Sequence, residues 1–542
     1  MNYSIPNTQH AVQLTGPGRL ILNPAKPVPV PGPHQILCRV EAVGLCFSDL
    51  KLLQRFSDHP RKKEIISGID PHILKEIPSY VPGSAPTVPG HEAVVRIWTV
   101  GKDIQTFKPG QRYLVQTDYR WLPTEGSNGS FGYNFEGALQ EYVLMDERVI
   151  TSPDGESMLL AAPEELSASA VALVEPWACV EEAYAEKQRR CLKTDGRILI
   201  ASQLKYDKDL LNALLDKFGK PADIDYVESA SQLETKHDFY DDIVYFGSSA
   251  QTVEALFSRL AAGGLFNIVL CNNRLDREVL TKLGRIHYSG IRIIGTRGNN
   301  PAQSMKYIPA CGEIRKKDKI NIIGAGGPMG IMHVIQNLCQ DTNDIEVFAG
   351  ETDESRLQNL KRIAEPLAKK NDVLFEAYNP AEQKLSQTFS YIIVMVPESK
   401  FVTQAIETAA EKAIINIFAG ISTEKSSKID LDTYIEKQLY FIGTSGSVLD
   451  DMKRLMSKLK SKKIDTNLTV AAICGLDGAI DGIKAVENRL IAGKIIVYPG
   501  CKGLPLLTLD SLSERLPEVA KELDDGMWNA KAEKKLLESW SK

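Results

Sequence analysis

Hydrophobic and polar positions follow different periods in successive parts of the chain. Up to about residue 165, short β-rich runs such as 35–40 alternate with Pro/Gly turns such as 29–33, which predicts an all-β unit. From 195 to about 464, buried apolar runs alternate with helical patterns, which predicts β-α-β units around parallel sheets. Residues 465–498 again alternate helix and strand. The expected fold class is therefore α/β with an all-β part.

A helical pattern joins the first two regions. Ser167 and Ser169 precede an apolar-periodic run that continues through Ala185, and serine is a favoured residue at the start of a helix. The helix expected over 164–189 carries Glu175. A polar, helical-looking tail ends the chain at 501–542, and no role can be inferred for it from the sequence.

The β-α-β rhythm occurs twice. Residues 391–419 align without a gap on 242–270 at an offset of 149, and the Ile-Gly-Thr-x-Gly sequence of 294–298 recurs at 442–446 at an offset of 148. Convergence between two buried β-α-β units could produce scattered identities, but the shared ending favours a duplicated Rossmann-type domain. The identical pairs in the aligned block are Ile243/Ile392, Val253/Val402, Ala261/Ala410, Asn267/Asn416 and Ile268/Ile417.

Only the second copy has a glycine-rich turn after its first strand. Glycines in such a turn let the backbone approach a pyrophosphate at a helix N-terminus, which favours anions. The equivalent turn of the first copy, 201–207, contains no glycine, so its side chains should block a pyrophosphate. The candidate cofactor-binding residues of the second copy are Gly324, Gly326, Gly327, Met329 and Gly330.

An acidic residue follows the next strand of the second copy. Glu351 stands twenty-five residues after Gly326, where a carboxylate accepts hydrogen bonds from the adenosine ribose and repels a 2′-phosphate. The positive charge of Arg356 nearby would instead favour a 2′-phosphate. The expected cofactor is NAD rather than NADP.

Length, composition and charge set the class of protein. A chain of 542 residues is expected to form three or four domains. The net charge of −5 gives no basic footprint for nucleic acid. We expect no membrane segment, because no apolar run is long enough and residues 1–4 lack a signal-peptide pattern. Nine scattered cysteines without a Cys-x-x-Cys pair indicate no disulfide framework, so a cytoplasmic location is expected.

Several potential metal ligands occur in the all-β part. Cys46 lies in Gly-Leu-Cys-Phe-Ser-Asp, and His91 and Glu92 follow a Pro-Gly turn. Thiolate, imidazole and carboxylate can form a zinc site with one position left open. Glu175 is a second carboxylate that could complete the set. Asp49 could fix the tautomer of the liganding histidine from outside the ligand shell.

Together these blocks resemble the zinc-dependent medium-chain alcohol and polyol dehydrogenases. The resemblance continues through 110–113, 137–143, the glycine turn, 441–452 and 493–497. The Glu-Pro sequence at 175–176 is similar to the sorbitol-type polyol enzymes, and residues 391–452 look most like L-sorbose 1-phosphate reductases.

The resemblance implies the following domains. A GroES-like zinc catalytic domain would occupy 1–189 and be completed by 465–500. A degenerate Rossmann-type repeat would follow at 190–316, an NAD-binding Rossmann domain at 317–464 and a helical tail at 501–542.

The resemblance also implies hydride transfer between NAD(H) and a polyol or ketose, possibly a sugar phosphate. Zinc held by Cys46 and His91, with Glu92 or Glu175 completing the shell, would polarise the substrate oxygen, and Ser48 would pass on its proton. Lys51 stands where relatives often continue the relay with a histidine. One zinc is expected, since no cysteine between Cys46 and Cys179 can build a structural zinc lobe.

Two alternatives remain open at this point. A lyase or epimerase could use a retained NAD for transient oxidation, and a non-catalytic scaffold could use the duplicated domains for assembly. The scaffold would need neither zinc nor the glycine turn.

Two further segments carry expectations. Residues 51–82 lengthen the gap before His91 and contain the basic cluster 61–63, which fits a solvated loop or, alternatively, a phosphate clamp. Strands around 291–294 and 440–442 lie at equivalent places in the two copies, so we expect an internal pseudo-dimer in which one copy braces the other. A conventional homodimer is the alternative.

Overall fold

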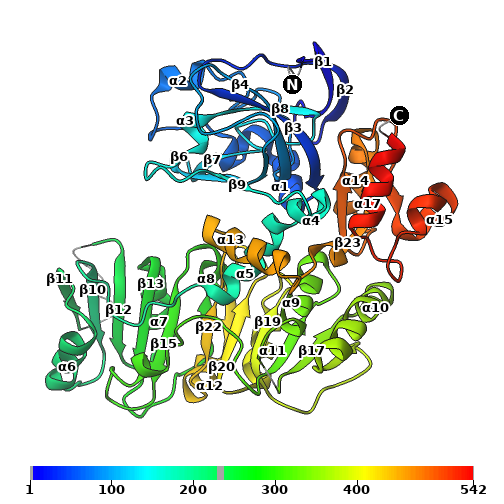
Figure 1. Cartoon of the computed structure of the whole chain (residues 1–542). Helices are drawn as coiled ribbons and strands as arrows, with labels where there is room; N and C mark the ends of the chain where they lie inside the picture. Colours follow the sequence, from blue (N-terminus) through cyan, green and yellow to red (C-terminus); the bar gives the residue numbers. More distant parts are fainter. Residues whose placement is uncertain (1–3, 229–236, 343, 541–542) are drawn as a thin grey trace. The chain divides into compact units, whose positions relative to one another are not determined.

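The computed structural model describes residues 4–228, 237–342 and 344–540. The chain forms two compact units, Met1–Ala178 with Val448–Lys542, and Cys179–Ser447. Figure 1 shows the course of the chain through both.

The first unit is built on a sheet of short, mostly antiparallel strands, as the alternation of β-rich runs and turns predicts. Late strands from the 465–498 region join it, because β24 pairs with β3 at Val497↔Val43. The order is β25 (Leu507–Thr508), β23 (Val470–Cys474), β24 (Lys494–Val497), β3 (Gln35–Gly44), β4 (Glu92–Val100), β5 (Arg112–Val115) and β9 (Leu159–Ala161), with β8 (Tyr142–Asp146) also on β3.

Two separate hairpins and several helices surround this sheet. The hairpins are β1 (Thr8–Leu14) with β2 (Leu20–Pro27), and β6 (Asp118–Thr124) with β7 (Ser127–Ser130). The helices are α1 (Phe47–Arg55), α2 (Pro71–Lys75), α3 (Glu147–Ile150), α4 (Ala168–Ala172), α5 (Val174–Ala185, which runs into the second unit), α13 (Leu449–Lys460), α14 (Leu476–Glu487), α15 (Leu512–Arg515), α16 (Pro517–Ala520) and α17 (Ala530–Trp540).

The segment 51–82 is packed, so the expectation of a solvated loop is wrong. Lys62 has no exposed surface, and its ammonium donates to the carbonyl of Ala85 at 2.9 Å. Arg61 forms an ion pair with Asp118 of β6 at 3.0 Å. The segment is therefore held against the β6–β7 hairpin through its own basic cluster.

The C-terminal tail belongs to the core of the first unit. Glu533 of α17 is buried and accepts hydrogen bonds from the N–H of Ser169 at 2.8 Å and the hydroxyl of Tyr498 at 2.9 Å. Trp528 is also buried and donates its indole N–H to Ser169 Oγ at 3.2 Å. An acidic side chain at the first turn of α4 satisfies backbone donors that the helix leaves unpaired. The tail thus supports the entry to α4.

The second unit contains two parallel sheets, as the repeated β-α-β pattern predicts. The first repeat has the order β11 (Asp223–Val227), β10 (Arg197–Ser202), β12 (Tyr240–Phe246), β13 (Leu260–Val269) and β15 (Arg292–Thr296). The second has β18 (Leu374–Tyr378), β17 (Glu346–Gly350), β16 (Lys319–Ile323), β19 (Phe389–Val394), β20 (Ala409–Ile417) and β22 (Tyr440–Ile442). The second order is that of a dinucleotide-binding Rossmann fold, and the first lacks one outer strand.

Strand register supports the duplication. Ile243 pairs with Phe266 in the first repeat, and Ile392 pairs with Ile415 at the same offset of 149 in the second. The helices of this unit are α6 (Lys208–Phe218), α7 (Ala250–Ser258), α8 (Gly284–Tyr288), α9 (Pro328–Leu338), α10 (Glu354–Asn371), α11 (Lys400–Thr408) and α12 (Leu431–Glu436).

The two repeats contact each other, as the pseudo-dimer hypothesis requires. Short strands β14 (Val279–Thr281) and β21 (Ser427–Ile429) pair antiparallel about Leu280↔Lys428. An offset of 148 maps Leu280 onto Lys428, so this pairing has an approximate two-fold relation between the repeats.

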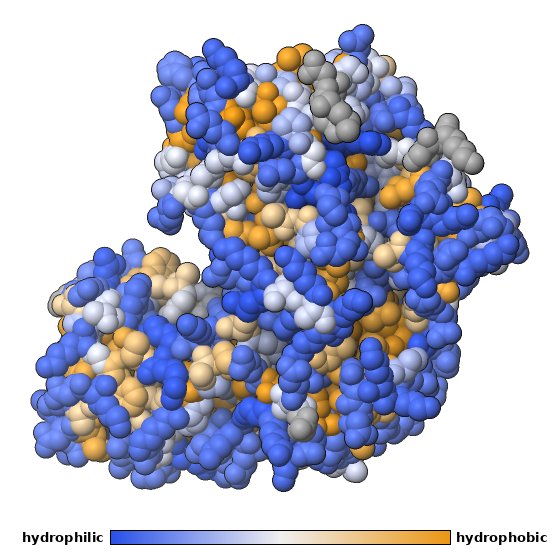
Figure 2. All heavy atoms as spheres, in the orientation of Figure 1, coloured by the Kyte–Doolittle hydropathy of each residue, from blue (hydrophilic) through white to orange (hydrophobic). Residues whose placement is uncertain are grey.

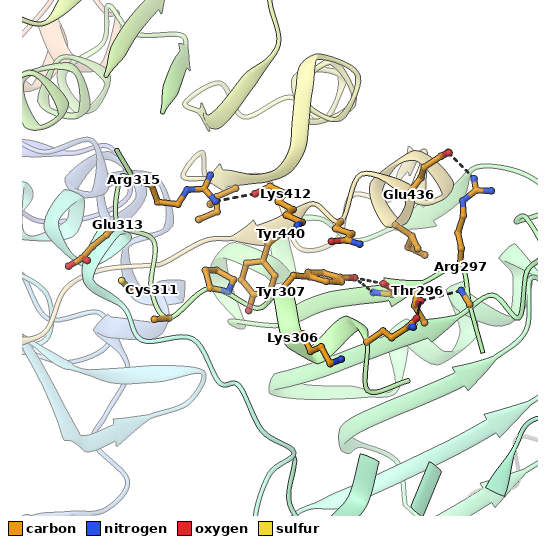
Figure 3. A pocket seen from close by; sticks show the side chains of 18 of the residues that line it. Thr296, Arg297, Lys306, Tyr307, Cys311, Glu313, Arg315, Lys412, Glu436 and Tyr440 are labelled. Carbon is orange, nitrogen blue, oxygen red and sulfur yellow. Dashed lines mark hydrogen bonds and ion pairs between the residues drawn. The ribbon is translucent and has the colours of Figure 1, made fainter. Parts of the chain in front are cut away.

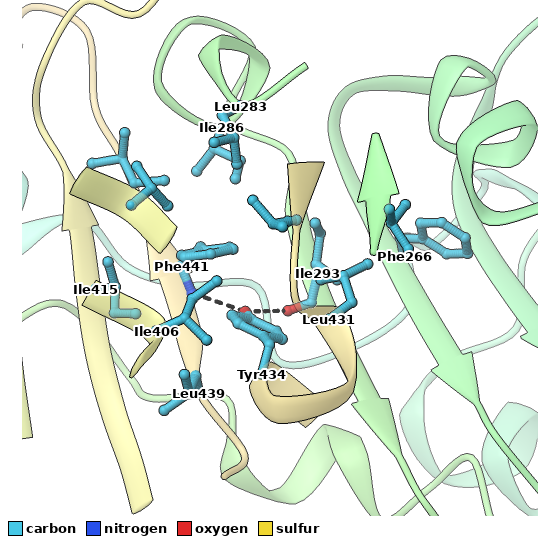
Figure 4. Packing of buried hydrophobic residues seen from close by; sticks show 14 of the residues in the cluster. Phe266, Leu283, Ile286, Ile293, Ile406, Ile415, Leu431, Tyr434, Leu439 and Phe441 are labelled. Atoms are coloured by element: carbon cyan, nitrogen blue, oxygen red, sulfur yellow. Dashed lines mark hydrogen bonds between the residues drawn. The ribbon is translucent and has the colours of Figure 1, made fainter. Parts of the chain in front are cut away.

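A shared apolar core lies beside this pairing. Figure 4 shows Ile286 and Ile293 of the first repeat packed with Phe441 and Tyr434 of the second. The hydroxyl of Tyr434 donates to the carbonyl of Ile293 at 2.8 Å and accepts from the N–H of Phe441 at 3.0 Å. One core therefore holds the edge strands β15 and β22 together.

Hydrophilic residues predominate on the face shown in Figure 2, and hydrophobic residues show mainly between them. Within the described part of the chain, no helix has both the length and the apolar composition needed to span a bilayer.

Candidate metal and dinucleotide sites

Strand register brings three potential ligands together in the first unit. Gly44 at the end of β3 pairs with Glu92 at the start of β4, so Cys46, just beyond β3, lies beside His91 and Glu92. The Cys46 thiol, one ring nitrogen of His91 and one carboxylate oxygen of Glu92 all lie within 4.8 Å of one another. Among the described residues, no other group of three His, Cys, Asp or Glu side chains meets this geometry.

Asp49 and Ser48 surround the histidine. Asp49 Oδ1 lies 3.0 Å from His91 Nδ1, which directs Nε2 towards the thiol. Ser48 Oγ donates to Cys46 Sγ at 3.0 Å and lies 3.2 Å from His91 Nε2. Burial opposes a charged imidazole, but Asp49, Tyr133 and Cys46 together hold the pKa of His91 well above its usual value.

Glu92 is fully buried, and only one of its two carboxylate oxygens is hydrogen-bonded within the described part of the chain. Lys494 of β24 donates to Glu92 Oε1 at 2.6 Å and to the carbonyl of Leu45 at 2.7 Å. The other oxygen, Oε2, has no hydrogen-bond partner among the described residues. A Cβ on Gly44 would lie only 2.1 Å from this oxygen, so only glycine leaves room for it. A buried carboxylate oxygen without a partner is costly, and a cation between it, the thiol and the imidazole would satisfy it.

Glu175, in the first turn of α5, is close to this group without belonging to it. Burial raises the pKa of its carboxyl to about 7, while the charge of His91 acts in the opposite direction. The geometry therefore distinguishes Glu92 from Glu175, which the sequence left as equivalent candidates for the third ligand. Glu92 presents an oxygen to the thiol and imidazole, and Glu175 is a buried neighbouring acid.

The residue types fit zinc. A thiolate, an imidazole and a carboxylate supply three protein ligands and leave a fourth position open, which is typical of catalytic zinc sites.

Sequence reasoning missed Lys494 and Tyr133. Lys494 is a lysine in an apolar strand, which is a signal for a buried partner. The Tyr133 ring is buried 5.8 Å from the His91 ring, and the guanidinium of Arg61 lies 5.3 Å from the Tyr133 ring. Nothing in the local sequence marks Tyr133.

In the second unit, the glycine turn connects β16 to α9. Gly324 has φ of 84°, a left-handed conformation that favours glycine. Gly327 caps α9 without a side-chain hydrogen bond, and a Cβ built on it meets no atom within 4 Å. Met329 lies in the first turn of α9. Open space thus lies beside the N-terminus of α9, as a bound pyrophosphate would require.

Glu351 closes the other side of this turn. Its Oε2 accepts from the N–H of Gly326 at 3.0 Å, and a Cβ on Gly326 would lie 2.6 Å from that oxygen. A Cβ on Gly330 would lie 2.6 Å from the carbonyl of Ala325, so this glycine allows α9 to pack against the turn. The structure thus brings Glu351 and the glycines together at one end of β16.

The first repeat differs at the corresponding turn. Asp207 caps α6 and accepts from the N–H of Asp209 at 2.8 Å. Tyr206 stacks on Phe246 with ring centroids 4.5 Å apart. A carboxylate already occupies the helix N-terminus and an aromatic pair fills the turn, so a second anion would be repelled there.

Comparison with known proteins connects the part of the chain that carries the metal ligands to dehydrogenases. Residues 32–154 match the alcohol dehydrogenase GroES-like domain. L-sorbose 1-phosphate reductase of Klebsiella pneumoniae is 27% identical over 233 residues, which cover 41% of this chain and 56% of that protein. Human sorbitol dehydrogenase is 33% identical over 101 residues, or 19% and 22% of the two chains. The chain thus spans about half the length of the first of these relatives.

Solved structures agree on the fold. The 2R,3R-butanediol dehydrogenase of Bacillus subtilis superposes with a TM-score of 0.54 at 15% identity, covering 91% of this chain and all of that one. Among the similar structures one holds NADH and another NADP. At this identity the likeness shows a medium-chain dehydrogenase fold and leaves the choice of cofactor open.

Proposed function

We propose that this chain, a homologue of the zinc-type alcohol and polyol dehydrogenases, transfers a hydride between NAD(H) and a polyol or ketose. The carrying observation is the set of Cys46, His91 and Glu92, in which a buried carboxylate with one unpaired oxygen lies beside a thiol and an imidazole. Bound zinc would supply Lewis-acid polarisation of a substrate oxygen. NAD would be the hydride carrier, seated on the glycine turn of the second repeat.

Several side chains support the metal ligands. Lys494 holds Glu92 by one oxygen, and the other has no hydrogen-bond partner among the described residues. Asp49 fixes the orientation of His91. Ser48 lies within hydrogen-bonding distance of the ligand atoms and is the group nearest them that can take up or release a hydroxyl proton. The buried Glu175 carboxyl, with its pKa near neutrality, is suited to hydrogen-bond a water or substrate hydroxyl.

NAD is the proposed cofactor, because Glu351 presents a carboxylate over the glycine turn. We expect Glu351→Ser to raise kcat/KM with NADPH relative to NADH by about tenfold, the effect of roughly 1.4 kcal/mol of lost charge repulsion. Steady-state kinetics with both cofactors measure this ratio. Glu354→Ser, which removes a neighbouring carboxylate at the start of α10, is the matched control. A wild-type preference for NADPH would contradict the assignment.

We further propose that the substrate carries a phosphate. The 51–82 segment places Arg61 over Tyr133, which in turn lies beside His91. Burial, helped by the positive charges of Arg61, Arg55 and Lys51, lowers the pKa of His59 to about 4. Several cations therefore gather on the Tyr133 side of the ligand set, where they would attract a substrate phosphate.

Arg61→Ala should lower kcat/KM for a ketose 1-phosphate by about tenfold to a hundredfold, the range of one charge-assisted hydrogen bond. The value for the unphosphorylated ketose should change little. Both rates are measured by NADH absorbance, and Lys75→Ala, an exposed lysine of the same segment, is the control. If both substrates lose activity equally, Arg61 serves the fold rather than the phosphate.

The contact between the two repeats also predicts the oligomeric state. The edge strands β15 and β22 already share a core within one chain, so the surface that could pair with a second subunit is covered. We expect a monomer of about 59.9 kDa in sedimentation equilibrium at micromolar concentration. A stable dimer would show that the repeats do not replace a partner subunit.

A further inference from the structure

The second unit contains a pocket of about 920 Å³ that the proposed reaction does not use (Figure 3). One wall is residues 295–298 at the carboxyl end of β15, and another is the linker residues 303–315. The second repeat supplies residues 412–414 and 435–440. Ligands of open α/β sheets bind outside the carboxyl ends of strands, and this volume suits a small molecule. The first repeat thus keeps a ligand-sized space although its glycine turn is lost.

The charge of the lining is mainly positive. Arg297 pairs with Glu436 at 2.8 Å and Arg315 pairs with Asp318 at 3.2 Å. Lys306 also lines the pocket, and within the described ranges it forms no ion pair. Arg297 Nε is buried without a hydrogen-bond partner among the described residues, so the pairing with Glu436 leaves one of its donors unused.

Lys412 is the second lining lysine that has no ion pair with any described residue. It has φ of 60°, whereas the equivalent position of the first repeat, at an offset of 149, is Gly263 with φ of 69°. A side chain in this conformation is strained, and such residues gather at functional sites. The second repeat therefore tolerates strain that places an ammonium at the pocket.

The rest of the lining offers aromatic and aliphatic surface. The Tyr307 hydroxyl is bonded to the carbonyl of Gly295, and the Tyr440 hydroxyl donates to Gln188 at 3.2 Å. The Tyr307 ring therefore presents carbon rather than a free hydroxyl to a ligand, and Tyr440 is buried behind the lining. Glu313 is the remaining acid of the lining, and in Figure 3 its carboxylate points away from the labelled lysines.

We propose that this pocket binds a small organic anion, with its phosphate or carboxylate attracted by the ammonium groups of Lys306 and Lys412 and its carbon body against Tyr307. The two lysines come from different repeats, so the ligand would bridge them. This site is separate from the glycine turn and does not depend on the proposed reaction.

Isothermal titration of the full chain with glycerol 2-phosphate tests the proposal, with glycerol as the uncharged comparison. We expect saturable binding of the phosphate and none of glycerol. The double variant Lys306→Ala/Lys412→Gly should weaken binding about tenfold or more, from the loss of two ion pairs. Glycine at 412 accepts the left-handed conformation, so thermal melting should remain at or above that of the wild type.

Three variants locate the binding. Arg61→Ala and Gly326→Val alter the other surfaces expected to hold anions, and Lys384→Ala removes an exposed lysine elsewhere on the unit. Each should retain the glycerol 2-phosphate affinity. The proposal is overturned if the wild type shows no saturable binding. It is equally overturned if Arg61→Ala, Gly326→Val or Lys384→Ala weakens binding as much as the lysine pair does.

Discussion

Cys46→Ser is expected to lose zinc and about a thousandfold in kcat/KM while the fold is retained. Serine replaces a soft thiolate with a weakly acidic hydroxyl, and a bound metal contributes several kcal/mol of transition-state stabilisation. Cys46 is the residue before α1, with Ser48 Oγ and His91 as near neighbours of its thiol, and serine is a favoured residue at this position of a helix, so the fold should be retained. Elemental analysis and NADH-linked rates measure the two effects.

Cys191→Ser, at an exposed thiol outside the site, is the matched control and should keep zinc and activity. His91→Ala should lose zinc as Cys46→Ser does. Full zinc content in either ligand variant, or two zinc ions per wild-type chain, would contradict the assignment.

Gly326→Val is expected to weaken NADH binding about a hundredfold. A Cβ at this position already lies 2.6 Å from Glu351 Oε2 and 2.8 Å from Arg356 Cβ, so the valine side chain would displace them and fill the approach to the turn. A hundredfold loss of affinity corresponds to about 3 kcal/mol of binding free energy. Fluorescence titration with NADH measures the change in affinity.

Ser202→Val makes the comparable change at the turn of the first repeat and should leave NADH affinity nearly unchanged. If Ser202→Val weakens binding and Gly326→Val does not, the dinucleotide lies on the first repeat. Circular dichroism melting shows whether either variant merely unfolds.

The fold could be predicted where a hydrophobic period continues over many residues. Buried runs such as 242–246 and 391–394 recur at a constant offset, and strand register preserves that offset. The same regularity predicted the contact of 291–294 with 440–442. The period of the apolar side chains shows which face of a strand is buried. Because the two repeats have equivalent apolar edge strands, each edge can be covered by the other.

The 51–82 segment could not be predicted in the same way. A run of Arg61, Lys62 and Lys63 is usually solvated, because burying an ammonium is costly. Here a single carbonyl, that of Ala85, receives the Lys62 ammonium, and a partner so distant in sequence leaves no local pattern. Glu533 of the tail is a similar case, since Ser169, whose N–H donates to its carboxylate, lies more than three hundred residues earlier.

The candidate site shows a third limit. Glu92 and Glu175 have the same chemistry, and spacing alone could not choose between them. The choice depends on strand register between β3 and β4 and on Lys494, which occupies one oxygen of Glu92. Both features arise only when segments far apart in the sequence pair.

Zinc-dependent NADH oxidation tests the central claim most directly. The purified chain is assayed with ketoses and ketose 1-phosphates, then after removal of metal by a chelator, and again after one equivalent of zinc is returned. The account predicts NADH oxidation with at least one of these substrates, its loss with the metal and its recovery with one zinc per chain. NADH oxidation that continues unchanged after the metal is removed, or no oxidation with any substrate of the panel, would contradict it.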